Sequence, residues 1–280
     1  MKRKNVTLIF ILFFITIFAA TKSMASPGKA NSLFPTVPPA SIPSLINEYY
    51  QDIRDLNLVY IFPNNPEYFS RFSKLYSDWL GRLKSVDFNS LDVSDRVDFI
   101  LLKRNIQNDE YDLKQDEKDY QQFSYALPFA DNVVALQQKR RRGQRPDAMA
   151  TAKDFNEIQL QIDKAKTVVS KTPLPDKNLL NKTIETIKEL RNGLKNVYDF
   201  YNGYDPDFTW WMKKTYPDTD SALVAYSKWL SLQPVAKADK AMDSSGIIGH
   251  PVGREKIEQL LKSEMIPYSP EELIKIAYKE

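Results

Sequence analysis

Apolar residues recur every three or four positions along most of the chain, a spacing typical of helices that bury one face. The first stripe follows Ser44 and ends near Pro63, and it consists of Leu45, Ile46, Tyr49, Ile53 and Leu56. A second stripe opens at Pro66 and alternates steps of three and four, which predicts a helix packed against a partner helix. Its members are Phe69, Phe72, Tyr76, Trp79 and Leu83.

The middle of the chain predicts three further helices. The first runs to about Tyr120 through a charged stretch expected to face solvent, and its opening apolar residues are Val93, Val97, Ile100 and Leu101. Pro146 suits the first turn of the second helix, whose stripe is Ala152, Phe155, Ile158, Ile162, Ala165 and Val169. The third helix ends at Asn202-Gly203, which supplies the left-handed backbone that helix ends prefer. Its stripe is Leu180, Ile184, Ile187, Leu194, Val197 and Tyr201.

The last part of the chain predicts three shorter helices. One runs from about Ala222 to Leu230, and another lies around residues 257–265, after a glycine-containing turn at 246–253. Ser269-Pro270-Glu271-Glu272 has the spacing of a capping box with proline in the first turn, so a final helix begins there. The chain stops three turns later, at Glu280, without a capping glycine. We interpret this end either as an ordinary frayed terminus or as a point where more sequence once followed.

These patterns predict an all-α fold, an irregular multi-helix bundle without internal repeats. No segment alternates apolar and polar residues convincingly enough to predict a strand. The whole chain has only eight glycines. We expect one continuous helical domain over residues 44–280, preceded by a Pro- and Ser-rich tether at 26–43 that cannot sustain a helix.

The first 25 residues have the pattern of a signal peptide. A basic start at Lys2, Arg3 and Lys4 precedes an uncharged apolar run over residues 6–20. Small residues then place the expected cleavage between Ala25 and Ser26. The run is shorter than a membrane span requires, so an uncleaved anchor is the less favoured alternative. We therefore expect a periplasmic or secreted protein with no stable membrane span after cleavage.

The cysteine count and the net charge exclude some anchors and make one class of partner unexpected. The chain has no cysteine, which excludes a lipoprotein anchor and disulfide bonds. Removal of the four basic leader residues from a formal charge of +3 leaves about −1. A near-neutral mature chain gives no bulk electrostatic reason to expect nucleic acid as a partner.

No complete catalytic or metal-binding set is evident. A hydrolytic zinc needs three protein ligands, and the single histidine, His250, lies in a turn-like Gly-His-Pro context. With one histidine and no cysteine, the chain also gives no support for a Ser-His-Asp or Cys-His nucleophile system. Asp205 and Asp207 could act as a paired acid and base, but turn chemistry around Pro206 is the favoured interpretation. We predict no catalytic residue, metal ligand or cofactor in this chain.

Two surface features remain as candidates for binding. The aromatic segment from Tyr204 to Trp211 is expected to be a loop that either locks two helices together or lines a groove with Tyr204, Trp210 and Trp211. Packing is the favoured role. The basic run Lys139–Arg145 could meet phosphates or another polyanion, but a helix C-terminus at Gly143 also attracts cations, and we favour this structural role.

Several segments resemble, in the same order, the bacterial family called domain of unknown function 885, and together they span nearly all of the mature chain. They are residues 95–102, 126–129, 200–206, 208–212, 253–260 and 264–274. Members are often exported and largely helical, and they are considered similar to zinc metallopeptidases because their later half carries a His-Glu segment followed by Pro-Gly-His. Nothing in this chain matches that half, so no functional residue can be carried over.

The resemblance implies that Ser26 to Glu280 corresponds to the N-terminal half of a longer family member, with zinc expected only in the missing half. The first hypothesis is therefore the front part of a zinc-dependent peptidase-like hydrolase, inactive alone, whose partner is a separately encoded catalytic half. A peptide substrate is expected only when the two halves are combined. The alternative is a non-enzymatic helical binding module of the cell envelope that uses the groove around Trp210 and Trp211.

Overall fold

The computed structural model describes residues 41–237 and 252–280, and the regular elements in these ranges are all helical. The predicted all-α class is thus confirmed for this part of the chain. The leader with its cleavage site at Ala25 and Ser26, most of the tether, and His250 lie outside the described residues. The helices are α1 (Ile42–Val59), α2 (Pro66–Lys84), α3 (Val93–Phe123), α4 (Ala130–Arg141), α5 (Ala148–Lys171), α6 (Lys177–Tyr201), α7 (Pro206–Ser231), α8 (Gly253–Ser263) and α9 (Pro270–Lys279), with short 3₁₀ turns at Phe88–Ser90 and Ser124–Ala126.

Side-chain caps and prolines fix where many of these helices begin. Ser41 caps α1, so Ile42 and Pro43 belong to the helix and not to the predicted tether. Asn65 caps α2, and Pro66 occupies its first turn as predicted. Ser269 and Glu272 form the predicted capping box of α9. Pro146, in contrast, lies just outside α5, whose cap is Asp147.

Most predicted stripes are buried, but the apolar residues predicted for α3 and those of α8 and α9 are largely exposed. All five apolar residues of the α2 stripe and all six of the α5 stripe are in the core. In α3, however, Val93 and Val97 are 78% and 50% exposed. The buried face of α3 consists of Phe99, Leu102, Ile106, Leu113, Tyr120 and Phe123. The prediction chose the wrong face because the apolar residues at the start of α3 are not confined to one side.

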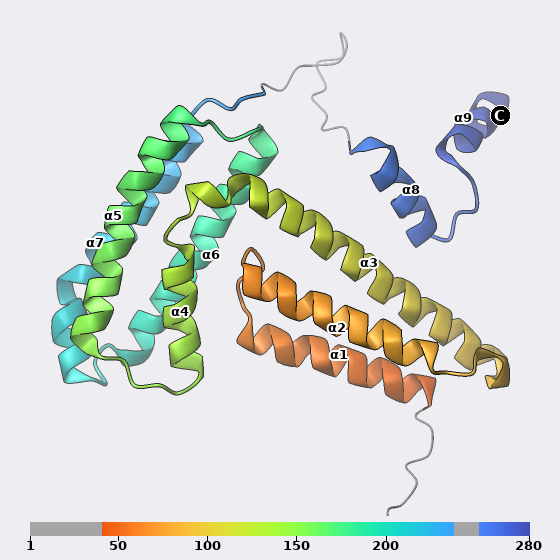
Figure 1. The fold of residues 1–280 in the computed structure, drawn as a ribbon, viewed down its shortest axis with the longest axis horizontal. Helices are drawn as coiled ribbons and strands as arrows, with labels where there is room; N and C mark the ends of the chain where they lie inside the picture. Colours follow the sequence, from red (N-terminus) through yellow and green to blue (C-terminus); the bar gives the residue numbers. More distant parts are fainter. Residues whose placement is uncertain (1–40, 238–251) are drawn as a thin grey trace, which may run out of the picture. The chain divides into compact units, whose positions relative to one another are not determined.

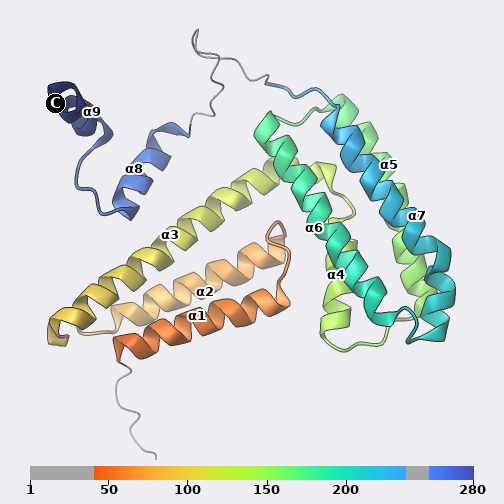
Figure 2. The ribbon, with the colours of Figure 1, turned by 180° about the vertical axis from the view of Figure 1, so that it is seen from behind.

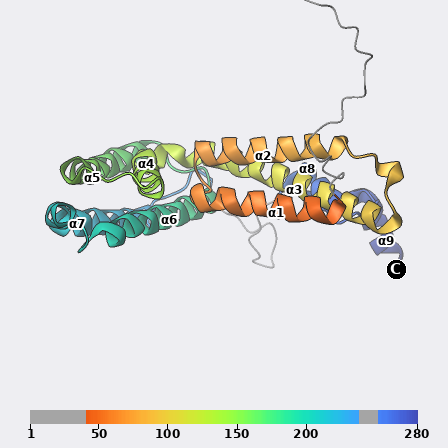
Figure 3. The same cartoon turned by 90° about the horizontal axis from the view of Figure 1, so that it is seen from below.

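The helices α4 to α7 pack as a four-helix group. Within it α4 packs on α6 and α5 on α7, and Figure 3 shows α4 and α5 on one side with α6 and α7 on the other. The helices α1, α2 and α3 pack against one another beside this group (Figure 1). Arg191 of α6 makes a bidentate ion pair with Asp220 of α7, with N–O distances of 2.8 and 2.9 Å. This pair supplements the apolar contact between the two helices.

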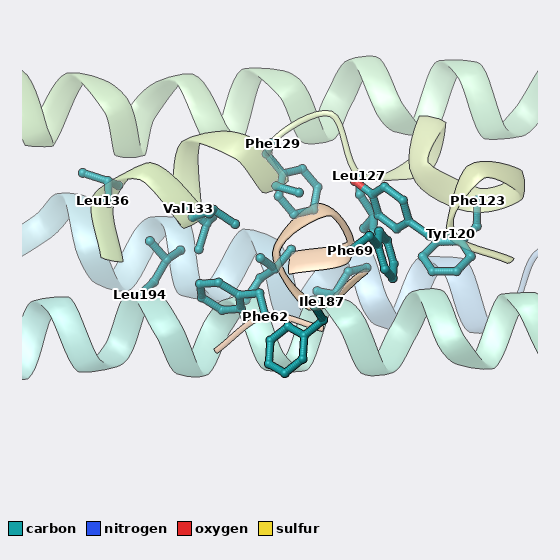
Figure 4. Packing of buried hydrophobic residues seen from close by; sticks show 14 of the residues in the cluster. Phe62, Phe69, Tyr120, Phe123, Leu127, Phe129, Val133, Leu136, Ile187 and Leu194 are labelled. Carbon is teal, nitrogen blue, oxygen red and sulfur yellow. The ribbon is translucent and has the colours of Figure 1, made fainter. Parts of the chain in front are cut away.

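The α1–α2 loop joins the two sets of helices. Phe62, in this loop, is buried and lies against α6 at Gly193. Figure 4 shows Phe62 among core side chains of α4 and α6, including Val133 and Leu194. The neighbouring Asn64 donates a hydrogen bond to the Thr186 hydroxyl of α6 at 2.9 Å. An apolar contact with polar links at its edge therefore holds the loop on the four-helix group.

The helices α8 and α9 form a linked pair. Arg254 of α8 pairs with both carboxylate oxygens of Glu271 in α9 and also with Glu258 of its own helix. Neither helix has a buried residue. On α8, Lys256 pairs with Asp112 of α3 at 2.6 Å.

Replacement of Gly193 by alanine is expected to destabilise the fold. A Cβ atom there would lie 2.3 Å from Cζ of Phe62, so the ring must move out of its buried site. Overpacking of this kind costs about 1–3 kcal/mol, against a helix-propensity gain of about 1 kcal/mol for alanine over glycine. The net effect of Gly193→Ala is therefore a loss of up to about 2 kcal/mol in the free energy of unfolding, measured by urea titration.

Gly81 in α2 provides the matched control, because a Cβ there meets no atom within 4 Å. Gly81→Ala is expected to raise the free energy of unfolding by about 0.5–1 kcal/mol. Combining Gly193→Ala with Phe62→Leu should recover part of the loss. Equal stabilisation by both glycine substitutions would contradict the close packing of Phe62 on α6.

Candidate functional site

The basic run and the aromatic segment, far apart in the sequence, lie at one end of the four-helix group. The α4–α5 and α6–α7 connections are both at this end, as Figures 1 and 2 show from opposite sides. We call residues 139–145 and 200–214 together the basic-aromatic end. The structure thus brings together the basic run, the Asp205–Asp207 pair and the predicted groove residues.

Three contacts hold the two connections together. The Tyr201 hydroxyl donates a hydrogen bond to the Gln144 carbonyl oxygen at 3.1 Å. The Arg145 guanidinium donates two hydrogen bonds to one carboxylate oxygen of Asp205, at 3.2 and 3.3 Å. The Arg140 guanidinium lies over the ring of Phe200, 5.3 Å from its centroid. These contacts fix the α4–α5 connection on the corner between α6 and α7.

Asp205 is the N-cap of α7. Its carboxylate accepts a hydrogen bond from the backbone N–H of Phe208 at 3.1 Å. This bond, followed by the Arg145 guanidinium, holds the pKa of Asp205 below its ordinary value. Asp205 is therefore ionised at neutral pH and cannot serve as a general acid. The structure thus shows Asp205 in a local backbone role beside Pro206, which agrees with the favoured interpretation.

The predicted loop from Tyr204 to Trp211 is wrong beyond Asp205, because α7 begins at Pro206. Gly203 has a φ of 81°, which confirms the predicted left-handed exit from α6. The separate helix predicted from Ala222 is the second half of α7, which continues through Pro217. Pro217 is exposed, so the carbonyl that lacks its N–H partner can bond to water.

The aromatic side chains at the start of α7 point in two directions. Phe208 and Met212 are fully buried, so for Phe208 the packing role holds. Trp210 and Trp211 are 71% and 39% exposed, and Tyr204 is 85% exposed. Their side chains do not lock the helices together. Buried and exposed side chains alternate here because the segment is helical. The loop expected from the sequence does not predict this alternation.

A shallow groove runs along the exposed side of α7. It has a volume of ≈ 520 Å³ and is lined by Trp210, Trp211, Lys213, Lys214, Pro217 and Asp218. Tyr204 is not among the lining residues. The two indole rings lie 5.0 Å apart, edge to face. Aromatic faces beside two ammonium groups suit an anionic or amphipathic partner.

The basic run begins at the C-terminus of α4, as the structural interpretation expected. Gly143 has a φ of 67°, and the guanidinium of Arg141 donates a hydrogen bond to the Leu58 carbonyl oxygen. Within the described ranges, Lys139 and Arg142 have no carboxylate in ion-pair range. The run therefore combines side chains with a structural partner and cations that are exposed to solvent.

A larger groove of ≈ 710 Å³ lies along α3 and was not predicted. Its polar lining comes mainly from the charged stretch of α3 and from α8, with Lys84 at the end of α2, whereas Leu83, Phe88 and Phe99 contribute apolar surface. The charged lining residues are Lys84, Lys103, Arg104, Glu110, Lys114 and Lys262. The sequence contained no indication of this groove, because cations along a long helix are typical of a face that is exposed to solvent.

Comparison with known proteins adds no relative. No family model, curated protein or solved structure matches the chain. The resemblance to domain of unknown function 885 therefore rests on the quoted segments alone. In residues 41–237 and 252–280, no three His, Cys, Asp or Glu side chains gather as metal ligands. No helix in these ranges is long and apolar enough to cross a bilayer.

The segments that carry the resemblance include several structural contacts. Residues 126–129 connect α3 to α4 and contain buried Ala126 and Phe129. The Tyr226 hydroxyl donates a hydrogen bond to the Ala126 carbonyl at 2.8 Å. Asp205 and the Arg254–Glu271 pair lie in other such segments. These contacts show that the segments stabilise the fold. They do not indicate a catalytic role for any of the segments.

Replacement of Asp205 by alanine is expected to lower the melting temperature, because it removes both the cap of α7 and the partner of Arg145. The native pKa of Asp205 is lowered, so its stabilising contribution is present above the unfolded-state pKa and is lost as pH falls through the native pKa. The difference in melting temperature between the two proteins should therefore be largest near neutral pH and shrink in acid. Asp207→Ala, at an exposed neighbouring position, serves as the control and should have a smaller effect.

Proposed function

We propose that this chain is the non-catalytic helical part of an exported peptidase-like hydrolase, and that the apolar side of α8 and α9 is the surface on which a separately encoded catalytic half docks. Two observations support the proposal: the family resemblance of the quoted segments, and the exposed apolar residues of these two helices. Export would follow from a leader at residues 1–25 with cleavage between Ala25 and Ser26, which gives a periplasmic or secreted protein.

The exposed apolar residues of α8 and α9 carry this proposal. They are Ile257, Leu260, Met265, Ile266, Tyr268, Ile274, Ile276 and Tyr278, all between 37% and 88% exposed. Large apolar side chains exposed in such number on two short helices are typical of an interaction site. The pairs of Arg254 with Glu271, and of Lys256 with Asp112, leave these apolar side chains free for a partner. A catalytic half that covered them would complete a hydrolase whose zinc ligands lie on the other polypeptide.

One observation favours the alternative, a stand-alone binding module of the cell envelope. Trp210 is 71% exposed although it lies on a helix with a fully buried inner side. An exposed tryptophan next to Lys213 and Lys214 has the character of a contact residue. A stand-alone module would be monomeric without a companion, and its tryptophan emission would change with ligand.

Elemental analysis tests the proposed division of labour. The chain purified from Ser26 onward is expected to carry far less than one zinc per molecule and to cleave no peptide, because its proposed zinc ligands belong to the companion. Stoichiometric zinc, or turnover by this chain alone, would overturn the proposal.

Translation of the DNA after codon 280 in three frames should reveal a His-Glu segment followed by Pro-Gly-His.

Dye binding tests the docking surface. The double variant Ile274→Gln/Tyr278→Gln is expected to bind less of a fluorescent apolar dye than the unaltered chain, since both side chains are exposed. Its melting temperature should stay unchanged because neither side chain belongs to the core. Lys275→Gln/Lys279→Gln, on the same helix, is the matched control and should leave dye binding as it was. A large loss of melting temperature in the first variant would show that α9 packs in the folded chain.

A further inference from the structure

The exposed aromatic residues of the basic-aromatic end are spread over its surface and do not share one cavity. Phe200 is 56% exposed and Tyr204 85%, and both lie near the corner between α6 and α7. Trp210 and Trp211 follow on α7, with their rings at 88° to each other. Rings in this arrangement offer no parallel faces to clamp a flat ligand. The surface suits a broad partner better than a small molecule.

Basic residues are in excess around these aromatic side chains. Residues 139–149 and 200–218 contain seven Lys and Arg and four Asp. Two of the carboxylates, Asp147 and Asp205, accept hydrogen bonds as the caps of α5 and α7. The other two, Asp207 and Asp218, are exposed to solvent. Lys139, Arg142, Lys213 and Lys214 have no ion-pair partner among the described residues. The end is therefore locally positive on a chain that is near neutral after the leader.

We propose that the basic-aromatic end binds the surface of a bilayer that contains anionic phospholipid. Tyrosine and tryptophan prefer the level of the lipid headgroups, and lysine and arginine are attracted to anionic lipid. Trp210 lies four residues beyond Pro206, about 6 Å along α7. Interfacial side chains enter the headgroup region by about 5–10 Å. The corner and the first turn of α7 fit within that depth.

The end keeps its shape before it meets a membrane. The Asp205 cap, the Arg145–Asp205 pair and the Tyr201–Gln144 hydrogen bond hold the corner in place. Thr209 adds a further link, because its hydroxyl accepts from the Gly203 N–H at 2.8 Å. Binding therefore needs no folding of this segment, and the proposal is independent of the docking surface on α8 and α9.

Vesicle sedimentation tests the proposal. The chain from Ser26 onward is used, because it keeps every residue of the described core while the apolar leader would itself enter lipid. It is expected to sediment with vesicles of equal parts phosphatidylglycerol and phosphatidylcholine, and not with phosphatidylcholine alone. Added salt should weaken binding. Tryptophan emission should shift to shorter wavelength on binding.

Two double variants separate the aromatic and the basic contributions. Trp210→Ser/Trp211→Ser should lose the emission shift and bind vesicles about tenfold more weakly or worse, with an unchanged melting temperature. Arg142→Ser/Lys213→Ser should weaken partitioning by at least about tenfold, since each cation near an anionic surface contributes roughly fivefold. The matched control is Lys171→Ser/Lys177→Ser, at the exposed α5–α6 connection at the opposite end of the group. It should bind like the unaltered chain.

Three results would overturn the proposal. The first is equal binding to neutral and anionic vesicles. The second is an equal loss of binding in the control variant, which would indicate attraction by overall charge. The third is binding of the chain to double-stranded DNA as tight as to anionic vesicles, with no effect of the tryptophan substitutions on either, which would identify a general polyanion surface.

Discussion

The contact of the Phe62 ring with α6 at Gly193 is the constraint on which the arrangement of the helices depends. The ring fits because residue 193 has no side chain, so the α1–α2 loop can approach the α6 backbone closely. The Asn64–Thr186 hydrogen bond and the pairs of Lys182 with Asp116 and Asp119 add polar links around it. These links tie the helices α1, α2 and α3 to the four-helix group, and they hold α6 between Lys182 and Gly193. Its remaining turns lead to the corner that presents the basic-aromatic end.

The sequence predicted the fold class and most helices, for reasons that are local. The stripes of α2 and α5 needed only the helical period, and Pro66 and Ser269 marked helix starts through capping chemistry. The helix α4 was not predicted, apart from its end at Gly143, because its buried residues, among them Ala130 and Gln137, do not form a clear apolar stripe. The continuation of α7 through Pro217 was missed because proline usually ends a helix.

The candidate site could be predicted in pieces but not as a whole. The basic run and the tryptophans are visible in the sequence, yet their proximity depends on contacts between residues that are 57 and 60 positions apart. One of these contacts, from the Tyr201 hydroxyl to the Gln144 carbonyl, involves a backbone group that every residue has. A pattern of residue types therefore cannot predict this hydrogen bond. The direction of Trp210 followed from the helical period once α7 was known to begin at Pro206.

The ion pair between Arg254 and Glu271 has a consequence for recognition. It links α8 to α9 at the surface, and the Ser269–Glu272 box sets where the second helix starts. A partner that met this hairpin would find these two links already formed. Less conformational entropy would then be lost on association than for two unlinked helices. Neutralising Arg254 would therefore change the cost of ordering the hairpin without altering any apolar side chain that the partner touches.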